Sequence, residues 1–225
     1  MLDWSAIDTI LLDMDGTLLD LHFDNFFWME HLPKRLAELK DIHPEVVSKD
    51  LLDKVRQLQG QLNWYCLDYW SRELDVDIPT LKEEVRHLIG FRPFVEEFLK
   101  TMRDSRHRVV MVTNAHRKSL DLKLRQVDLT PYFDNIVSSH DFGVPKEDIA
   151  FWSRLQEVEP FQPDRALLID DSLPVLRSAK EYGVAHLLAV LHPDSKRPAN
   201  EETEFKGILH FDQILPANVI VNSKV

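Results

Sequence analysis

Short apolar runs that alternate with helix-like segments constrain the fold of this 225-residue chain more than any other feature. The runs are rich in Val, Ile and Leu, which is typical of strands buried on both faces of a parallel sheet. Most intervals between them suit a single crossover helix. The sequence therefore predicts an α/β fold with the strands Thr9–Leu12, Arg108–Thr113, Asn135–Ser139, Ala166–Asp170 and His186–Val190.

The interval between the first two predicted strands is far longer than the about a dozen residues that a parallel crossover needs. Its apolar residues recur at helical spacing, so we expect an inserted α-helical cap domain over residues 21–90 and a core formed by residues 1–20 and 91–225. The helices expected in the cap are Asp24–Lys40, Pro44–Gln59, Leu62–Leu74 and Pro79–Ile89. Those expected in the core are Phe94–Met102, Arg117–Val127, Lys146–Val158 and Leu173–Tyr182, and residues 194–205 should form a loop.

Charge and composition exclude several classes of protein. The formal net charge of −11 opposes binding to a nucleic-acid polymer, where Lys and Arg must replace counterions. No stretch approaches the roughly 20 apolar residues that cross a bilayer, and residues 1–5 lack the pattern of a secretory signal, so we expect a cytoplasmic protein without membrane contact. Cys66 is the single cysteine, which excludes an internal disulfide and a thiolate metal site and suggests a small buried side chain.

Two carboxylates, Asp13 and Asp15, follow the first predicted strand directly. In open α/β sheets, ligands bind where the strands end. Carboxylates this close repel one another unless a cation compensates their charge or one of them is protonated, and a divalent metal would resolve the repulsion. The plainer alternative is a strand-ending turn in which the Asp side chains act as caps and Gly16 supplies a permissive backbone.

Polar residues also follow three other predicted strands, and the carboxyl ends of parallel strands meet at one edge of a sheet. A cation, several carboxylates and hydroxyl and amide donors at one edge are suited to phosphoryl transfer. The residues are Thr113 and Asn114 at the end of the second strand, Lys146 beyond Gly143 after the third, and Asp170, Asp171 and Ser172 at the end of the fourth.

In this order, these segments resemble the motifs of the haloacid dehalogenase (HAD) superfamily of aspartate-nucleophile phosphatases, in its helical-capped subgroup. The resemblance spans the whole chain and implies a Rossmann-like parallel sheet core. Asp15 favours phosphate esters, because family members that cleave carbon–halogen bonds need no acid for the leaving group. The four motifs correspond to Asp13-Met14-Asp15-Gly16-Thr17, Thr113-Asn114, Lys146 and Asp170-Asp171-Ser172.

The resemblance implies a role for each of these residues. Asp13 would attack phosphorus to form an aspartyl-phosphate, and Asp15 would protonate the leaving oxygen and then activate water. Thr113 and the main chain of Asn114 would hold phosphate oxygens near a helix N-terminus. Lys146 would pair with the nucleophile and the phosphoryl group.

A Mg²⁺ cofactor is implied as well, because its octahedral preference suits oxygen ligands. These would be Asp13, the main-chain carbonyl of Asp15, and Asp171 with Asp170 close behind. Which of the last two coordinates the ion directly is open, although Asp171 aligns better.

Each residue also has a plainer interpretation. Thr113 and Ser172 could only cap helices. Lys146 could be a solvated residue in the first turn of its helix, and Glu147 after it departs from the Pro that is common in the family at this place. Asp170 and Asp171 could form an ordinary turn, although burying two acids needs a reason.

The substrate must be read from the cap, whose aromatic residues could stack a nucleobase or simply form its core. The runs around Asp13, at residues 62–71 and at residues 145–148 resemble bacterial purine 5′-nucleotidases of the GMP/IMP type, which implies a small phosphorylated partner, a purine mononucleotide. Asn63 and Asp68 could read the edges of the base or be ordinary helix residues. The aromatic residues are Phe23, Phe26, Phe27, Trp28, Trp64, Tyr65, Tyr69 and Trp70.

Three other functions stay open from the sequence. A sugar-phosphate phosphatase would be indifferent to a base. A phosphomutase or phosphotransferase would pass the phosphoryl group to a second hydroxyl. A non-catalytic binding protein could keep the same fold, because fold alone does not imply function.

Overall fold

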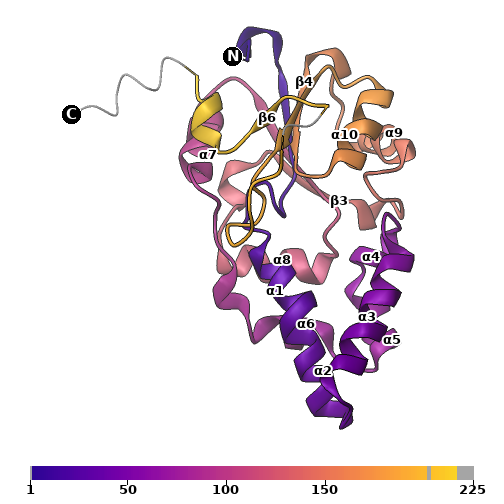
Figure 1. Ribbon diagram of the computed structural model, residues 1–225. Helices are drawn as coiled ribbons and strands as arrows, with labels where there is room; N and C mark the ends of the chain where they lie inside the picture. Colours follow the sequence, from indigo (N-terminus) through magenta and orange to yellow (C-terminus); the bar gives the residue numbers. More distant parts are fainter. Residues whose placement is uncertain (1, 202–203, 217–225) are drawn as a thin grey trace, which may run out of the picture.

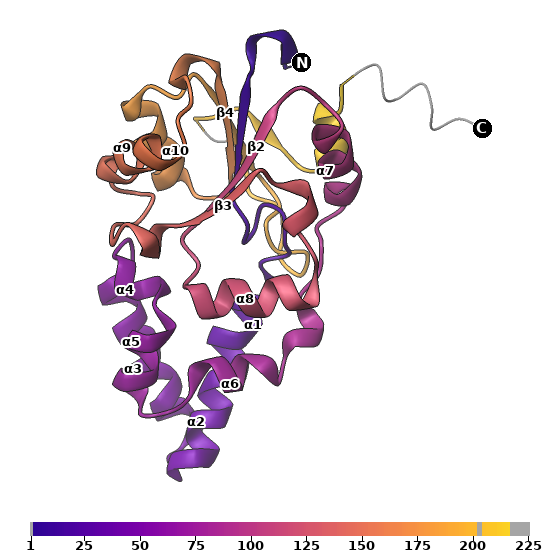
Figure 2. The same ribbon diagram turned by 180° about the vertical axis from the view of Figure 1, so that it is seen from behind.

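A parallel six-stranded sheet in the order β3-β2-β1-β4-β5-β6 forms the centre of the protein (Figures 1 and 2). The computed structural model describes residues 2–201 and 204–216. The strands are β1 (Thr9–Leu12), β2 (Arg108–Thr113), β3 (Asn135–Ser138), β4 (Ala166–Asp170), β5 (His186–Val190) and β6 (Gly207–Ile208). The predicted α/β class and its five strands are confirmed, whereas β6, with two residues, is too short to leave a pattern in the sequence.

The sheet is buried on both faces, as its continuous apolar strands require. Alternate residues of β1 point to opposite sides, so Ile10 and Leu12 join one hydrophobic cluster and Leu11 joins the other. Helices α9 (Ile149–Val158) and α10 (Leu173–Tyr182) pack on the side of Leu11, and α7 (Val95–Arg103) covers the other side (Figure 1).

The helical cap is inserted between β1 and β2 (Figure 1). Cys66 has an extended backbone that divides the predicted helix Leu62–Leu74 into two, and the predicted helix Pro79–Ile89 ends early at Glu83. The cap consists of α1 (His22–Phe26), the π-helical turn η2 (Phe27–His31), α2 (Leu32–Lys40), α3 (Pro44–Leu58), α4 (Leu62–Tyr65), α5 (Leu67–Leu74), α6 (Ile78–Glu83) and η3 (Arg86–Leu88).

Two core helices frame the loops that leave the sheet. Helix α8 (Arg117–Gln126) lies between the sheet and the cap (Figure 2). Helix α9 begins at Ile149 and not at Lys146 as predicted, because the side chain of Asp148 accepts a hydrogen bond from the N–H of Ala150 and starts the helix there. Lys146 is therefore in a loop.

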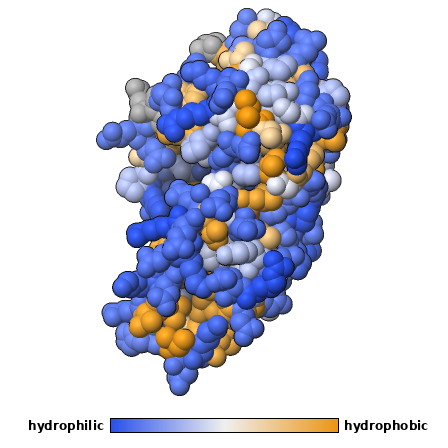
Figure 3. All heavy atoms as spheres, turned by 90° about the vertical axis from the view of Figure 1, so that its right-hand side faces the viewer, coloured by the Kyte–Doolittle hydropathy of each residue, from blue (hydrophilic) through white to orange (hydrophobic). Residues whose placement is uncertain are grey.

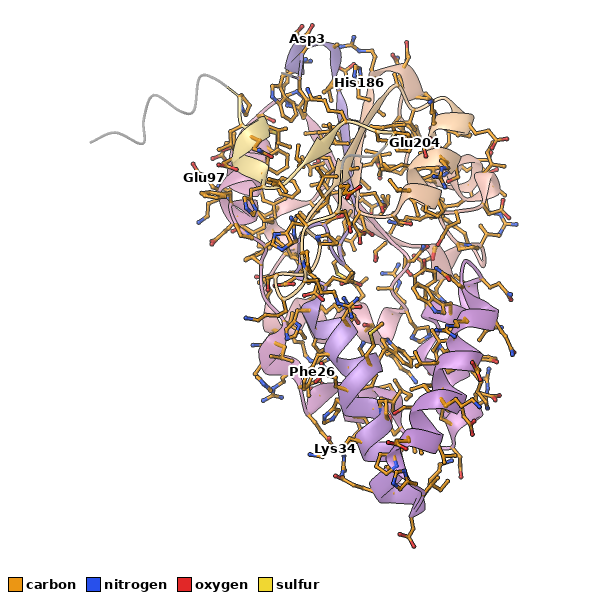
Figure 4. All side chains as sticks on the ribbon, in the orientation of Figure 1. Asp3, Phe26, Lys34, Glu97, His186 and Glu204 are labelled. Carbon is orange, nitrogen blue, oxygen red and sulfur yellow. The ribbon has the colours of Figure 1, made fainter. Side chains whose placement is uncertain are left out.

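The carboxyl ends of the strands face the cap. His186, which begins β5, lies at the end of the molecule opposite to Phe26 and Lys34 of the cap (Figure 4). Leu12 of β1 is in register with Met111 of β2 and Ile169 of β4, so the residues that follow these three positions arrive at the same edge. This register places the predicted site between sheet and cap.

The face drawn in Figure 3 is mostly polar, and hydrophobic side chains gather on it at the far end of the cap. Exposed apolar residues of the cap include Leu39, Ile42, Val46 and Leu52. Among the described residues, no helix is both long and apolar enough to cross a membrane.

Candidate active site

The loop after β1 brings Asp13 and Asp15 to the sheet edge. The N–H of Asp13 still donates to the carbonyl of Ile169 on β4, which fixes Asp13 at the end of the ladder. Gly16 then turns the chain with φ = 83°, and a Cβ there would lie 2.5 Å from Oδ2 of Asp171. Both the positive φ and the close approach require glycine, so Gly16 allows the β1 and β4 loops to touch.

Lys146 joins the carboxylates of two strands. Its Nζ donates to Oδ1 of Asp13 at 2.6 Å and to Oδ2 of Asp170 at 2.7 Å. The third hydrogen bond goes to the carbonyl of Val112 at 3.0 Å, so all three ammonium donors are used. Lys146 is only 1% exposed, so the interpretation as a solvated lysine in a first helical turn is wrong.

Burial and the neighbouring charges together set the pKa values of Lys146 and Asp13. Burial lowers the pKa of Lys146, but the negative charges of Asp13 and Asp170 outweigh it and raise the pKa above its ordinary value. Burial raises the pKa of Asp13 to about 6, with Lys146 opposing and Asp170 adding to the rise. At neutral pH the site therefore contains a protonated lysine between two acids.

Asp13, Asp170 and Asp171 form the acidic cluster of the site, with carboxylate oxygens within 4.8 Å of one another. Asp170 is engaged by Lys146 and by the N–H of Ser172. The carboxylate of Asp171 accepts no hydrogen bond from the described residues, and burial, followed by the charges of Asp13 and Asp170, raises its pKa well above the usual value. A cluster with more negative than positive charge and hard oxygen donors fits Mg²⁺.

The residues after β2 organise the loop that carries Lys146. The Thr113 hydroxyl accepts a hydrogen bond from the N–H of Ala115 at 3.0 Å, and Asn114 accepts one from the N–H of Lys146 at 2.9 Å. Both side chains are buried. Ser172 is the N-cap residue of α10, as its plainer interpretation expected, but its side chain accepts no capping hydrogen bond from the described part of the chain.

Glu147, the residue that departs from the family pattern, connects this loop to the cap. Its carboxylate accepts a hydrogen bond from the amide of Asn114 at 2.8 Å and one from the hydroxyl of Tyr65 on α4 at 2.5 Å. Burial, and next the charge of Glu147, raise the pKa of Tyr65, so the phenol stays a donor. The contact between Tyr65 and Glu147 could not be predicted from the sequence, because the two residues are far apart in the chain.

A buried chain of alternating charges links Asp15 to the cap. Nζ of Lys123 on α8 lies 2.6 Å from Oδ1 of Asp15 and 2.7 Å from Oδ2 of Asp24 on α1. Asp24 also pairs with Lys82 of α6 at 2.7 Å, and the Lys82 ammonium lies 4.7 Å from the ring centre of Phe23. Burial raises the pKa of Asp15 to about 6, although the charge of Lys123 opposes this rise.

Lys123, Asp24 and Lys82 were not among the site residues predicted from the sequence. One signal was available, because Lys123 follows Leu120 by three residues and Ser119 by four, and therefore lies on the same helix face as Leu120. That face is buried in the structure. A lysine on an apolar face is a candidate for a buried ion pair.

A cavity of about 210 Å³ extends from Asp15 into the cap. Its walls include the aromatic side chains of Trp28, Trp64, Tyr65 and Trp70, together with the charged pair Asp24 and Lys82. Phe23 and Phe27 are fully buried and belong to the hydrophobic core of the cap. Neither Asn63 nor Asp68 lines this cavity, and Asp68 instead pairs with Lys118 at 2.6 Å.

Charged side chains gathered at the carboxyl edge of a parallel sheet are typical of α/β proteins that bind their ligands there. The sequence profile of the haloacid dehalogenase-like hydrolases matches residues 7–183. The chain therefore belongs to the haloacid dehalogenase-like hydrolase family.

Individual relatives agree with this assignment. The chain is 35% identical over 214 residues to the GMP/IMP nucleotidase YrfG of Escherichia coli, covering 95% of this chain and 96% of the relative. It is 23% identical to a phosphorylated carbohydrates phosphatase of Thermotoga maritima, covering 83% and 86% of the two chains. The crystal structure of a HAD phosphatase from Thermococcus onnurineus is similar in fold, with a TM-score of 0.79, 19% identity and coverage of 96% and 98%.

Proposed function

We propose that this protein is a Mg²⁺-dependent phosphomonoesterase that works through an aspartyl-phosphate, and that it hydrolyses the purine 5′-nucleotides GMP and IMP to nucleoside and phosphate. The observation that carries the proposal is the buried Lys146 between Asp13 and Asp170, beside the carboxylate of Asp171, which has no partner within residues 2–201 and 204–216. The relative named GMP/IMP nucleotidase supports the choice of substrate.

In the first step, Asp13 attacks phosphorus and the bond from phosphorus to the leaving oxygen breaks. Lys146 orients the attacking carboxylate and offsets negative charge on the phosphoryl group. Asp15 gives its proton to the leaving nucleoside oxygen, so that a neutral alcohol departs.

In the second step, Asp15 takes a proton from water, the water oxygen attacks phosphorus, and the bond to Asp13 breaks. Asp15 must therefore act as acid and then as base, and a pKa of about 6 lies near the range in which both forms are accessible. Lys123 holds one oxygen of Asp15 and leaves the other for the substrate.

Thr113 and the main chain of Asn114, which precede α8, would hold the phosphate oxygens. Asp13, the main-chain carbonyl of Asp15, Asp170 and Asp171 would hold Mg²⁺, which neutralises the phosphate charge when bound. The excess of carboxylates and the raised pKa of Asp171 support this fit.

We assign specificity to residues 21–90, acting as the cap over the site. The cavity that opens beside Asp15 is lined by Trp28 and Trp64, whose rings can stack a base. An aromatic wall favours a nucleotide over a sugar phosphate.

The deciding experiment is phosphate release from GMP, IMP, AMP, CMP and a hexose phosphate, with Mg²⁺ or with EDTA, reported as kcat/KM. The proposal expects the highest values for GMP and IMP and no turnover in EDTA. Equal rates for all esters would retain the phosphatase and reject the nucleotidase. Transfer of phosphate to an acceptor sugar would indicate a phosphotransferase, and no turnover of any ester would indicate a binding protein.

A further inference from the structure

A second group of potential metal ligands lies at the junction of cap and core, apart from the acidic cluster. Cys66 separates α4 from α5 in the cap, His116 precedes α8, and His140 lies in the short 3₁₀-helix η5 (Ser139–Asp141) after β3. One ligand atom from each lies within 4.8 Å of the other two. Three segments that are distant in the sequence thus present a thiol and two imidazoles to one point.

The imidazole of His140 has a ring nitrogen that is available to a ligand. Its Nε2 is buried and has no hydrogen-bond partner among the described residues. A buried nitrogen without a partner is unfavourable unless it binds something. Burial, and next the neighbouring His116, lower the pKa of His140 to about 4, so at neutral pH this ring is uncharged and able to coordinate a metal.

His116 and Cys66 are only weakly engaged by their surroundings. Nδ1 of His116 accepts a long hydrogen bond of 3.4 Å from the N–H of Lys118, and its Nε2 lies 3.7 Å from a carboxylate oxygen of Asp68. Burial lowers the pKa of His116, which favours the neutral ring. The sulfur of Cys66 accepts one long hydrogen bond of 3.4 Å, from the N–H of Tyr69.

We propose that Cys66, His116 and His140 form a binding site for Zn²⁺ or a similar borderline divalent cation. One sulfur and two nitrogen ligands leave a fourth tetrahedral position for water. As the metal–sulfur bond forms, the thiol proton goes to solvent, and no electron is transferred. Nitrogen and sulfur ligands select a cation different from Mg²⁺, which prefers the oxygen atoms of the acidic cluster.

Two expectations about Cys66 from the sequence are revised. A single cysteine was expected to exclude a thiolate metal site, but the two histidines come from other segments and supply the missing ligands. Cys66 was expected to be buried, but it is half-buried at the surface where cap and core meet. Because Cys66 belongs to the cap and both histidines to the core, a bound ion would hold the cap against the core.

Titration of the full-length protein with Co²⁺ tests the site, because a thiolate bound to Co²⁺ gives a near-ultraviolet charge-transfer band. Cys66 is the single cysteine, so any such band reports this residue. The wild-type protein should show a band that saturates at one equivalent and disappears when Zn²⁺, the tighter binder, is added. Asp171→Asn, which alters the acidic cluster, should keep the band.

Three variants complete the design. Cys66→Ser should abolish the band, while His116→Gln and His140→Gln should each weaken Co²⁺ binding at least about tenfold. Circular dichroism spectra and thermal melting without metal show whether each variant folds. A wild-type protein without the band would overturn the proposal. So would an unchanged affinity in both folded histidine variants, because Co²⁺ would then be binding an isolated thiol. Phosphatase activity plays no part in this readout.

Discussion

Replacing Lys123 by Met should impair both stability and turnover, because this one cation holds Asp15 of the core and Asp24 of the cap. The side chain is 2% exposed, and it pairs with the two carboxylates at 2.6 and 2.7 Å. Methionine is similar in length and apolar, so the substitution removes the charge with little change in packing. Two half-buried carboxylates then lose their shared partner.

The size of the effect follows from what remains around these acids. Removing one partner of a buried ion pair costs about 3–5 kcal/mol of folding free energy. Asp24 keeps its pairing with Lys82, and the Asp15 side chain is 23% exposed to water. We therefore expect a loss near the lower end, about 3 kcal/mol, measured by urea unfolding at neutral pH.

The catalytic effect is separable from the effect on stability. A displaced general acid should lower kcat about 100-fold with a smaller change in KM, measured on the best substrate of the panel. Lys123→Arg keeps the charge and should recover part of this loss. Lys82→Met is the matched control, because it removes a buried cation from the same chain but leaves the pair of Lys123 and Asp15 intact.

If Lys123→Met unfolds at the same urea concentration as the wild type and retains its kcat, Lys123 does not have the role described. If Lys82→Met and Lys123→Met lower kcat equally, Lys123 does not position Asp15 for catalysis. In that case the charge chain would support only the packing of the cap.

Three further predictions address the rest of the site. Asp13→Asn should abolish turnover while the thermal melting curve stays cooperative, and substantial activity in the folded variant would exclude Asp13 as nucleophile. The pKa of Asp13 is raised to about 6, so in EDTA the free energy of unfolding should fall as the pH rises from about 4 to about 7 and this buried acid loses its proton. Asp171→Asn removes a neighbouring acid whose pKa is also raised and should recover about 1 kcal/mol or more at neutral pH. A flat pH profile would contradict this electrostatic account. Tyr65→Phe should remove the hydrogen bond to Glu147 and destabilise the protein by about 1 kcal/mol. The control variant Tyr69→Phe should change stability by less. Equal urea midpoints for the two variants would count against the contact between cap and core.

The sequence by itself determined the sheet and the residues at its edge. Continuous apolar runs can only be satisfied by burial on both faces, and the residues after such strands share one edge whatever the details of packing. Asp13, Asp15, Asp170 and Asp171 could be found in this way because each lies at the end of its strand or at most three residues beyond it. The helix break at Cys66 and the start of α9 after Asp148 were not found, because local capping overrides helical spacing there.

Only the tertiary structure decided which distant side chains meet. A lysine in a helix gives the same pattern whether it is solvated or buried, so Lys123 became informative only when α8 was placed between Asp15 and Asp24. The pairing of Glu147 with Tyr65 likewise joins two segments whose separation in the sequence carries no signal. Hydrophobic patterning is a local property of the chain, whereas an ion pair or a ligand cluster depends on the position of both partners in space.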